Sequence, residues 1–411
     1  MTRLTFAALA LLLPTLLEAD VGPKPRSTAA GFEVLGRDLK DLEVAMASEE
    51  VHLTLGREGQ DETLGVDATF HMRNDGPEVA FEEGFPVGPI NNMTGFSISI
   101  DGQAVKAELI DRKAGAGPDE NHDLWYVWKA TYKAGAESVR VVKYSIGISH
   151  FSEYRTTGYV LHTGAAWKGP IGKAVVTLRC AGKIGFDHIT DLRPRRDAEL
   201  KDGVCVWTRT NLEPTEADDI EISYNNAATW AERVAKLRAA TATAWSPRQE
   251  LVFTLEDAAA RQARERMTEP ELDDYLGALA LAIAEAKEQD GKLVLPATEP
   301  EQIDLSNLPP DAAAAMRQAM AGRTSPRPYV QSDDGEVITR LFDRALAAAT
   351  AYPDSARARA VLASYARLGQ AFLDGTLYAD AKPLVVHRSV REPFTKAMQG
   401  RLERAAALAK R

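Results

Sequence analysis

Apolar and polar residues alternate along much of the first half of the chain. In residues 66–73 every second side chain is apolar, which places the apolar residues on one face of a strand. Asp101-Gly102 lies between two such runs and is typical of a hairpin turn. Similar runs occupy residues 96–100, 105–109, 124–132, 139–148, 159–162, 173–180, 204–208 and 220–224. Short strands without interleaved helical patterns predict an antiparallel β-sandwich or barrel.

From about residue 227 the apolar spacing becomes that of helices. Trp230, Val234 and Leu237 follow at i, i+4 and i+7, which is one helix face. Thr268-Glu-Pro-Glu271 is a capping box with proline in the first turn, and it predicts a helix that ends at Gly291. The pattern predicts further helices at 310–321, 336–351, 354–368 and 392–410, and it allows short strands at Leu251–Leu255 and Lys292–Leu295.

The N-terminus has the pattern of a secretory signal. Arg3 precedes an apolar run from Leu4 to Leu17, and Ala19 supplies the small residue of a cleavage site. The run is shorter than the roughly 20 residues of a membrane span. We therefore expect a signal peptide at 1–19 and no transmembrane segment in the mature chain, which would be periplasmic or extracellular.

Together these patterns predict an α+β chain with three parts: the signal peptide, an N-terminal antiparallel β-sandwich over 20–226 and an α-rich C-terminal domain over 227–411. The 411 residues are 45% hydrophobic and 26% charged, which suits globular domains, and the net charge is −10. A moderately acidic chain gives no electrostatic reason to bind nucleic acid.

Cys180 and Cys205 are the two cysteines of the chain, and each lies in a predicted strand. An even pair in an oxidising compartment predicts a disulfide between two strands, worth about 3 kcal/mol in the chain-entropy model. A redox-active or metal-binding pair is the alternative, but Cys-x-x-Cys spacing is absent.

Trp125 and Trp167 are candidate ligand-stacking residues, because exposed aromatic rings in a β domain can stack on a sugar or a peptide. The alternative is that they pack in the core.

Motifs for catalysis or metal binding are weak. His150-x-x-Glu153 with His162 is the nearest set to a metal site, and Pro118–Asp123 is an acidic loop, but a polar strand face and a solvated loop explain them better. The sequence holds no Gly-x-Ser-x-Gly, no His-Glu-x-x-His and no phosphate-binding loop. We therefore assign no catalytic residue, expect no metal or cofactor, and cannot locate a carboxylate pair by spacing.

Two segments carry a family resemblance. The first is Met46-x-Ser48-Glu49-x-Val51-x-Leu53-x-Leu55, followed by Phe70-x-x-x-Asn74 and Phe85-Pro86; the second is Thr163-Gly-Ala-Ala-Trp167-Lys-Gly169-Pro-Ile-Gly172. They resemble segments of an exported bacterial family of unassigned function. This resemblance implies an extracytoplasmic β-sandwich and transfers no catalytic residue.

Phe85-Pro86 and the later Gly95-Phe96 to Gly102 hairpin also resemble the domain found in vault particles and in inter-alpha-trypsin-inhibitor heavy chains. Those proteins usually continue into a von Willebrand A domain with an Asp-x-Ser-x-Ser metal motif. That motif is absent here, so the resemblance implies shared architecture only.

The sequence favours a non-enzymatic envelope or secreted protein, whose sandwich binds an unidentified protein or glycan while the helical half docks or scaffolds. The alternative is an extracytoplasmic hydrolase with a carboxylate site between the two halves. A third hypothesis is glycan binding through exposed tryptophans.

Overall fold

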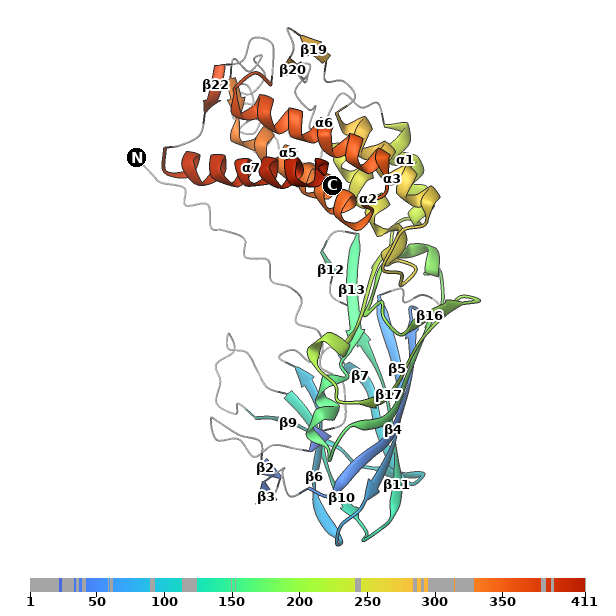
Figure 1. The fold of residues 1–411 in the computed structure, drawn as a ribbon. Coiled ribbons are helices and arrows are strands. Elements are labelled where there is room, and N and C mark those ends of the chain that lie inside the picture. Colours follow the sequence, from blue (N-terminus) through green and yellow to red (C-terminus); the bar gives the residue numbers. More distant parts are fainter. Residues whose placement is uncertain are drawn as a thin grey trace. The chain divides into compact units, whose positions relative to one another are not determined.

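The protein is described from a computed structural model (Figure 1). The described residues are 42–57, 59, 62–88, 93–112, 124–148, 153–240, 245–283, 314, 329–377 and 388–410, with short stretches at 22–23, 33–34, 37–38, 150–151, 287–289, 292–294 and 382–385. The predicted signal peptide, the acidic loop 118–123 and, except for Ala314, the helix predicted at 310–321 lie outside them.

The chain divides into two compact units. The β unit comprises Met1–Ala231 and Asp257–Arg266, and the helical unit comprises Glu232–Glu256 and Met267–Arg411. The predicted α+β class is confirmed, with strands in the N-terminal part and helices in the C-terminal part. The sequence pattern did not indicate that residues 257–266 pack with the β unit.

The largest sheet of the β unit has eight strands. Neighbouring strands are antiparallel except β4 and β14, which pair in parallel from Ser48 beside Lys173 to Leu55 beside Cys180. The sheet is therefore mixed, with one parallel pair among otherwise antiparallel strands. In spatial order the strands are β16 (Ala198–Lys201), β17 (Val204–Leu212), β14 (Ile171–Cys180), β4 (Val44–Leu55), β5 (Thr63–Asn74), β11 (Glu137–Gly147), β7 (Met93–Ile100) and β8 (Gln103–Val105).

Two four-stranded sheets complete the β unit. Buried side chains from these sheets and from the large sheet form one hydrophobic cluster, which includes Phe81, Phe70 and Ile222. The first small sheet has the order β1 (Gly22–Pro23), β6 (Val79–Gly88), β10 (Leu124–Tyr132) and β9 (Glu108–Asp111); the second has β12 (His150–Phe151), β13 (Tyr154–Tyr159), β18 (Ile220–Asn225) and β15 (Ile189–Arg193).

The predicted alternation is confirmed in β5, where Leu64, Val66, Ala68, Phe70 and Met72 are all buried. The predicted hairpin turn is confirmed as well. Asp101 and Gly102 join β7 to β8 with φ angles of 50° and 78°, the left-handed values that a tight hairpin requires.

A buried ion pair connects the first small sheet to the large one. Glu83 on β6 and Arg140 on β11 have side chains with no solvent exposure, and Arg140 Nε lies 3.1 Å from Glu83 Oε1. Trp128 Nε1 donates to Glu83 Oε2 at 2.6 Å, and the Tyr132 hydroxyl donates to Oε1. The guanidinium also lies 4.0 Å from the centre of the Tyr132 ring. Three donors therefore compensate one buried carboxylate.

A second buried carboxylate results from a β-bulge. The β4–β5 register shifts between Met46 and Ser48, so the inward-facing positions change from Val44 and Met46 to Glu49 and Val51. The Tyr159 hydroxyl on β13 donates to Glu49 Oε1 at 2.7 Å, and Oε2 has no partner. Burial raises the pKa of Glu49 to about 8, against a smaller lowering by the Tyr159 hydrogen bond. Glu49 is therefore mostly protonated at neutral pH.

The helical unit contains most of the residues of five long helices: α2 (Trp245–Ala260), α3 (Glu269–Ala282), α5 (Ser332–Ala351), α6 (Ala356–Leu373) and α7 (Arg388–Ala409). Helix α1 (Trp230–Ala239) begins in the β unit and continues in the helical unit. Gly335 lets α5, α6 and α7 meet, because a Cβ atom there would collide with the rings of Phe372 and Phe394. The Tyr365 hydroxyl donates to the carbonyl oxygen of Leu279 at 2.8 Å and joins α6 to α3.

Three sequence expectations for this half can be compared with the helices. The capping box at Thr268 and Glu271 is confirmed, but the helix ends at Ala282, not at Gly291. Residues 251–255 lie within α2, so the strand predicted there was wrong. The short strand predicted at Lys292–Leu295 is confirmed as β20 (Lys292–Val294), which pairs with β19 (Lys287–Gln289).

Two further short strand pairs are β2 (Glu33–Val34) with β3 (Arg37–Asp38), and β21 (Tyr329–Gln331) with β22 (Lys382–Val385). Within the described residues, no helix has the length and hydropathy for a membrane span.

We expect Arg140→Met to lower the free energy of unfolding by about 3–5 kcal/mol, because the Glu83 carboxylate would stay buried without its cation. Lys143→Met is the matched control on the same strand: Lys143 pairs with Asp67 at 2.6 Å, but their side chains are 58% and 41% exposed. The control should lose less than about 1 kcal/mol. Urea unfolding followed by tryptophan fluorescence measures both, and equal losses would contradict a structural role for the Glu83–Arg140 pair.

Glu49→Gln should remove a pH dependence of stability. The folded-state pKa of about 8 lies above the ordinary 4.5, so the wild type should lose stability as the pH rises from about 5 to 8, while the variant should not. Between pH 5 and pH 8 the free energy of unfolding of the variant should therefore rise by about 3–5 kcal/mol relative to that of the wild type. Thermal melts at pH 5, 6.5 and 8 test this, with the exposed neighbour Glu50→Gln as control; parallel pH profiles of all three proteins would exclude the effect.

Candidate functional site

A turn at the end of strand β15 gathers three arginines in the β unit. The strand ends at Arg193, and Pro194, Arg195 and Arg196 follow before β16 begins. The Arg193–Pro194 peptide bond is cis. The indole nitrogen of Trp207, on the neighbouring β17, donates to the carbonyl oxygen of Pro194 at 2.8 Å. The turn is thus attached to the large sheet.

Aspartates hold each of these arginines. Asp191 accepts from Arg193 Nε at 2.7 Å and from Arg195 Nη2 at 3.3 Å. Asp218 accepts from Arg196 Nη2 at 2.5 Å and from the buried Arg209 Nη1 at 2.8 Å. Burial tends to raise the pKa of Asp218, but hydrogen bonds from Thr215 and Arg196 and the charge of Arg209 outweigh it and hold that pKa below its ordinary value.

Asp219 has a structural role beside this cluster. Its Oδ1 accepts from the backbone N–H groups of Leu161 and His162 at 2.9 and 3.1 Å, and its Oδ2 lies 2.7 Å from His162 Nδ1. These contacts anchor the start of the short 3-10 helix η2 (His162–Ala166) to the segment before β18. The carboxylate is buried, and both its oxygens are engaged.

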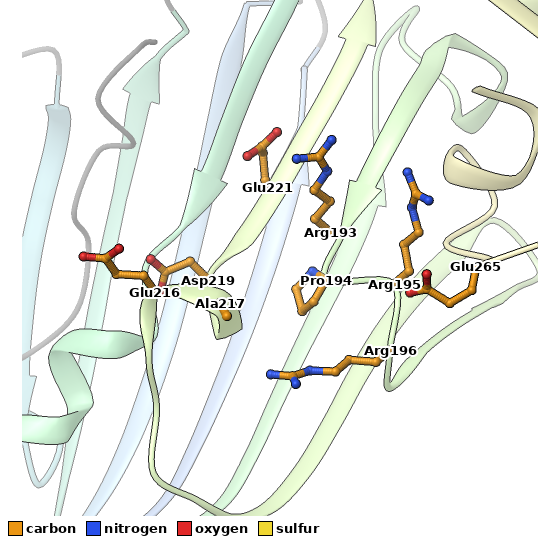
Figure 2. A pocket seen from close by; sticks show the side chains of 9 residues that line it. All are labelled: Arg193, Pro194, Arg195, Arg196, Glu216, Ala217, Asp219, Glu221 and Glu265. Carbon is orange, nitrogen blue, oxygen red and sulfur yellow. The ribbon is translucent and has the colours of Figure 1, made fainter. Parts of the chain in front are cut away.

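The arginine turn lines a cavity of about 550 Å³ (Figure 2). Its lining consists of Arg193, Pro194, Arg195, Arg196, Glu216, Ala217, Asp219, Glu221 and Glu265, all in the β unit. Small-molecule sites typically measure about 300–1,000 Å³ but are mostly apolar. Seven of the nine lining residues here are charged, so a ligand would be recognised by charge.

The charged side chains of the cavity that have no partner in the described part of the chain are its glutamates. Within the described residues, the side chains of Glu216, Glu221 and Glu265 make no hydrogen bond and no ion pair, whereas the arginines are paired with Asp191 and Asp218. Glu221 stands directly opposite Arg193 in the β15–β18 register. Its charge, after that of Asp191, helps to raise the pKa of Arg193 above its ordinary value.

The two candidate stacking residues are core side chains. Trp125 is 9% and Trp167 is 4% exposed. Trp167 packs against the rings of Phe81 and Tyr132, with centroids 6.2 Å away in each case, and Arg112 covers the ring of Trp125. This burial gives both residues a packing role and leaves the stacking interpretation without an exposed ring.

The predicted disulfide is not present, because Cys180 and Cys205 are separate thiols. They lie on the paired strands β14 and β17, but Cys205 stands opposite Leu178, so the cysteines occupy a diagonal. Diagonal Cα atoms in a sheet are about 7–8 Å apart, and a disulfide requires about 4.4–6.8 Å. This register is the physical reason for the correction.

No metal site is found in the part of the chain that the structure describes, which contains no group of three metal-ligating side chains. His162 of the candidate His150-x-x-Glu153…His162 set is bound to Asp219 instead. The sequence pattern did not indicate the cavity. Its only local signals were the run Arg193-Pro-Arg-Arg196 and the adjacent Asp218 and Asp219.

Comparisons with known proteins assign no family. No protein-family model matches the sequence, and no curated protein matches it either. A Legionella pneumophila protein described as a candidate nutrient-binding protein has a similar structure, with 16% identity, 75% of this chain and 98% of that chain covered, and a TM-score of 0.39. An M1 zinc metallopeptidase from Deinococcus radiodurans matches at 13% identity over 44% of this chain and 42% of its own, with a TM-score of 0.25. Similarities this low assign no function.

Native thiols should react slowly, because burial raises the pKa of both Cys180 and Cys205 to about 12 and leaves little thiolate. At pH 8 we expect negligible reaction with Ellman's reagent in the native protein and two thiols per chain in non-reducing denaturant. The Cys205→Ser variant should show one thiol per chain in the same denaturant. Finding no thiol in the denatured wild type would instead establish the disulfide.

Proposed function

We propose that this protein is an exported, non-enzymatic binding protein whose β unit holds a charged ligand in the arginine–glutamate cavity. The observation that carries the proposal is a cavity of about 550 Å³ lined by three arginines and four carboxylates. Export rests on the signal-peptide pattern of residues 1–19. The ligand is a small molecule or a charged group on an envelope protein or glycan.

The pairing of the charges favours binding over catalysis. Asp191 and Asp218 fix three guanidinium groups in position before any ligand arrives, which lowers the entropy lost on binding. The nine described lining residues include no serine, cysteine, histidine or lysine, so Glu216, Glu221 and Glu265 are the lining side chains that could act as a nucleophile. Asp219 is committed to η2 and is not available to activate one.

Native mass spectrometry of the mature protein, purified from its own envelope fraction without denaturation, tests the proposal. We expect a bound mass that is lost in the double variant Arg193→Gln/Glu221→Gln, which removes one charge of each sign and keeps the net charge. The matched control is Lys143→Gln/Asp67→Asn, which removes an exposed cross-strand pair of the same unit that does not line the cavity.

Absence of a bound mass in the wild type, or its persistence in the cavity variant, would contradict the proposal. Conversion of the released ligand on incubation with wild-type protein, detected by liquid chromatography, would favour the hydrolase alternative. Loss of the bound mass in both double variants would indicate a general effect of charge removal and would likewise overturn the assignment to this cavity.

A further inference from the structure

The charges of the cavity are mixed at the scale of single side chains. Arg193 and Glu221 stand directly opposite each other on neighbouring strands, about 5 Å apart across the sheet. Figure 2 shows their side chains extending in the same direction from β15 and β18. The cavity therefore presents hydrogen-bond donors and acceptors next to each other.

Both groups keep free capacity for a ligand. A guanidinium has five N–H donors, and Arg193 uses its Nε for Asp191, which leaves its two terminal nitrogens without a hydrogen bond in the described residues. The Arg193 side chain is 57% exposed, so these nitrogens are accessible. The Glu221 side chain has no hydrogen bond in the same part of the chain, and a carboxylate accepts through two oxygens.

A ligand with a single charge meets repulsion in this cavity. An anion that approaches the arginines also approaches Glu216, Glu221 and Glu265, and a cation that approaches these glutamates meets three guanidinium groups. Two like charges about 4 Å apart repel each other by about 1–4 kcal/mol in a partly hydrated site. A molecule with one charge of each sign gains both attractions and places each of its charges away from the like charge.

We infer that the ligand is a zwitterion of dipeptide size, whose carboxylate binds Arg193 and whose ammonium binds Glu221; this rests on the proposed binding function. The two ends of an extended dipeptide span at most about 7 Å, which is long enough to bridge two side chains whose strands lie about 5 Å apart. The positive Arg195 and Arg196 and the negative Glu216 and Glu265 line the same cavity around this pair.

Three molecules with one skeleton test the inference: alanyl-alanine, its N-acetylated form, which carries only the carboxylate, and its C-terminal amide, which carries only the ammonium. Isothermal titration calorimetry with the full mature chain should show that alanyl-alanine binds at least tenfold more tightly than either blocked form. A tenfold difference corresponds to about 1.4 kcal/mol.

Single variants assign each end of the ligand. Arg193→Gln should abolish the preference for alanyl-alanine over its amide and keep the preference over the acetylated form. Glu221→Gln should do the reverse. Lys143→Gln, on an exposed position outside the cavity, should change neither preference.

Equal binding of the acetylated form would make the cavity an anion site, and equal binding of the amide would make it a cation site. Either result overturns the inference and leaves the binding function intact. Failure of all three molecules to bind also overturns it, and the native mass measurement then decides separately whether the cavity holds a ligand.

Discussion

The parallel pairing of β4 with β14 is the constraint on which the β unit depends. It joins residues 48–55 to 173–180, although more than a hundred residues separate the two strands. β14 pairs with β17, and Trp207 on β17 holds the carbonyl oxygen of Pro194 in the arginine turn. A continuous series of strand pairings and one hydrogen bond thus connects the first hairpins of the chain to the cavity.

Buried polar pairs complement this pairing. Glu83–Arg140 connects the first small sheet to the large sheet, and Glu49–Tyr159 connects the large sheet to the second small sheet. Such pairs contribute little net stability, because desolvation offsets their attraction, but a misaligned sheet would leave a buried charge or hydroxyl without a partner. We interpret them as contacts that favour one arrangement of the three sheets over its alternatives.

The cavity combines fixed and free charges. Asp191 and Asp218 hold the arginines, Asp219 anchors the start of η2, and the glutamate side chains keep their hydrogen-bonding capacity. A site built in this way is organised before binding, so less conformational entropy is lost when a ligand enters. The charged lining also differs from the mostly apolar lining of ordinary small-molecule pockets, which is why we base recognition on charge.

The α+β class, the alternating strands such as β5, the Asp101-Gly102 hairpin and the capping box at Thr268 could be predicted from the sequence, because they depend on residues close together in the chain. Other features depend on contacts between distant segments. A one-residue bulge turned Glu49 inward, the β14–β17 register separated Cys180 from Cys205, and packing buried Trp125 and Trp167. The cavity belongs to the same class, since Arg193, Asp219 and Glu265 converge only when β15 pairs with β18 and residues 257–266 pack with the β unit, and no local pattern encodes those contacts.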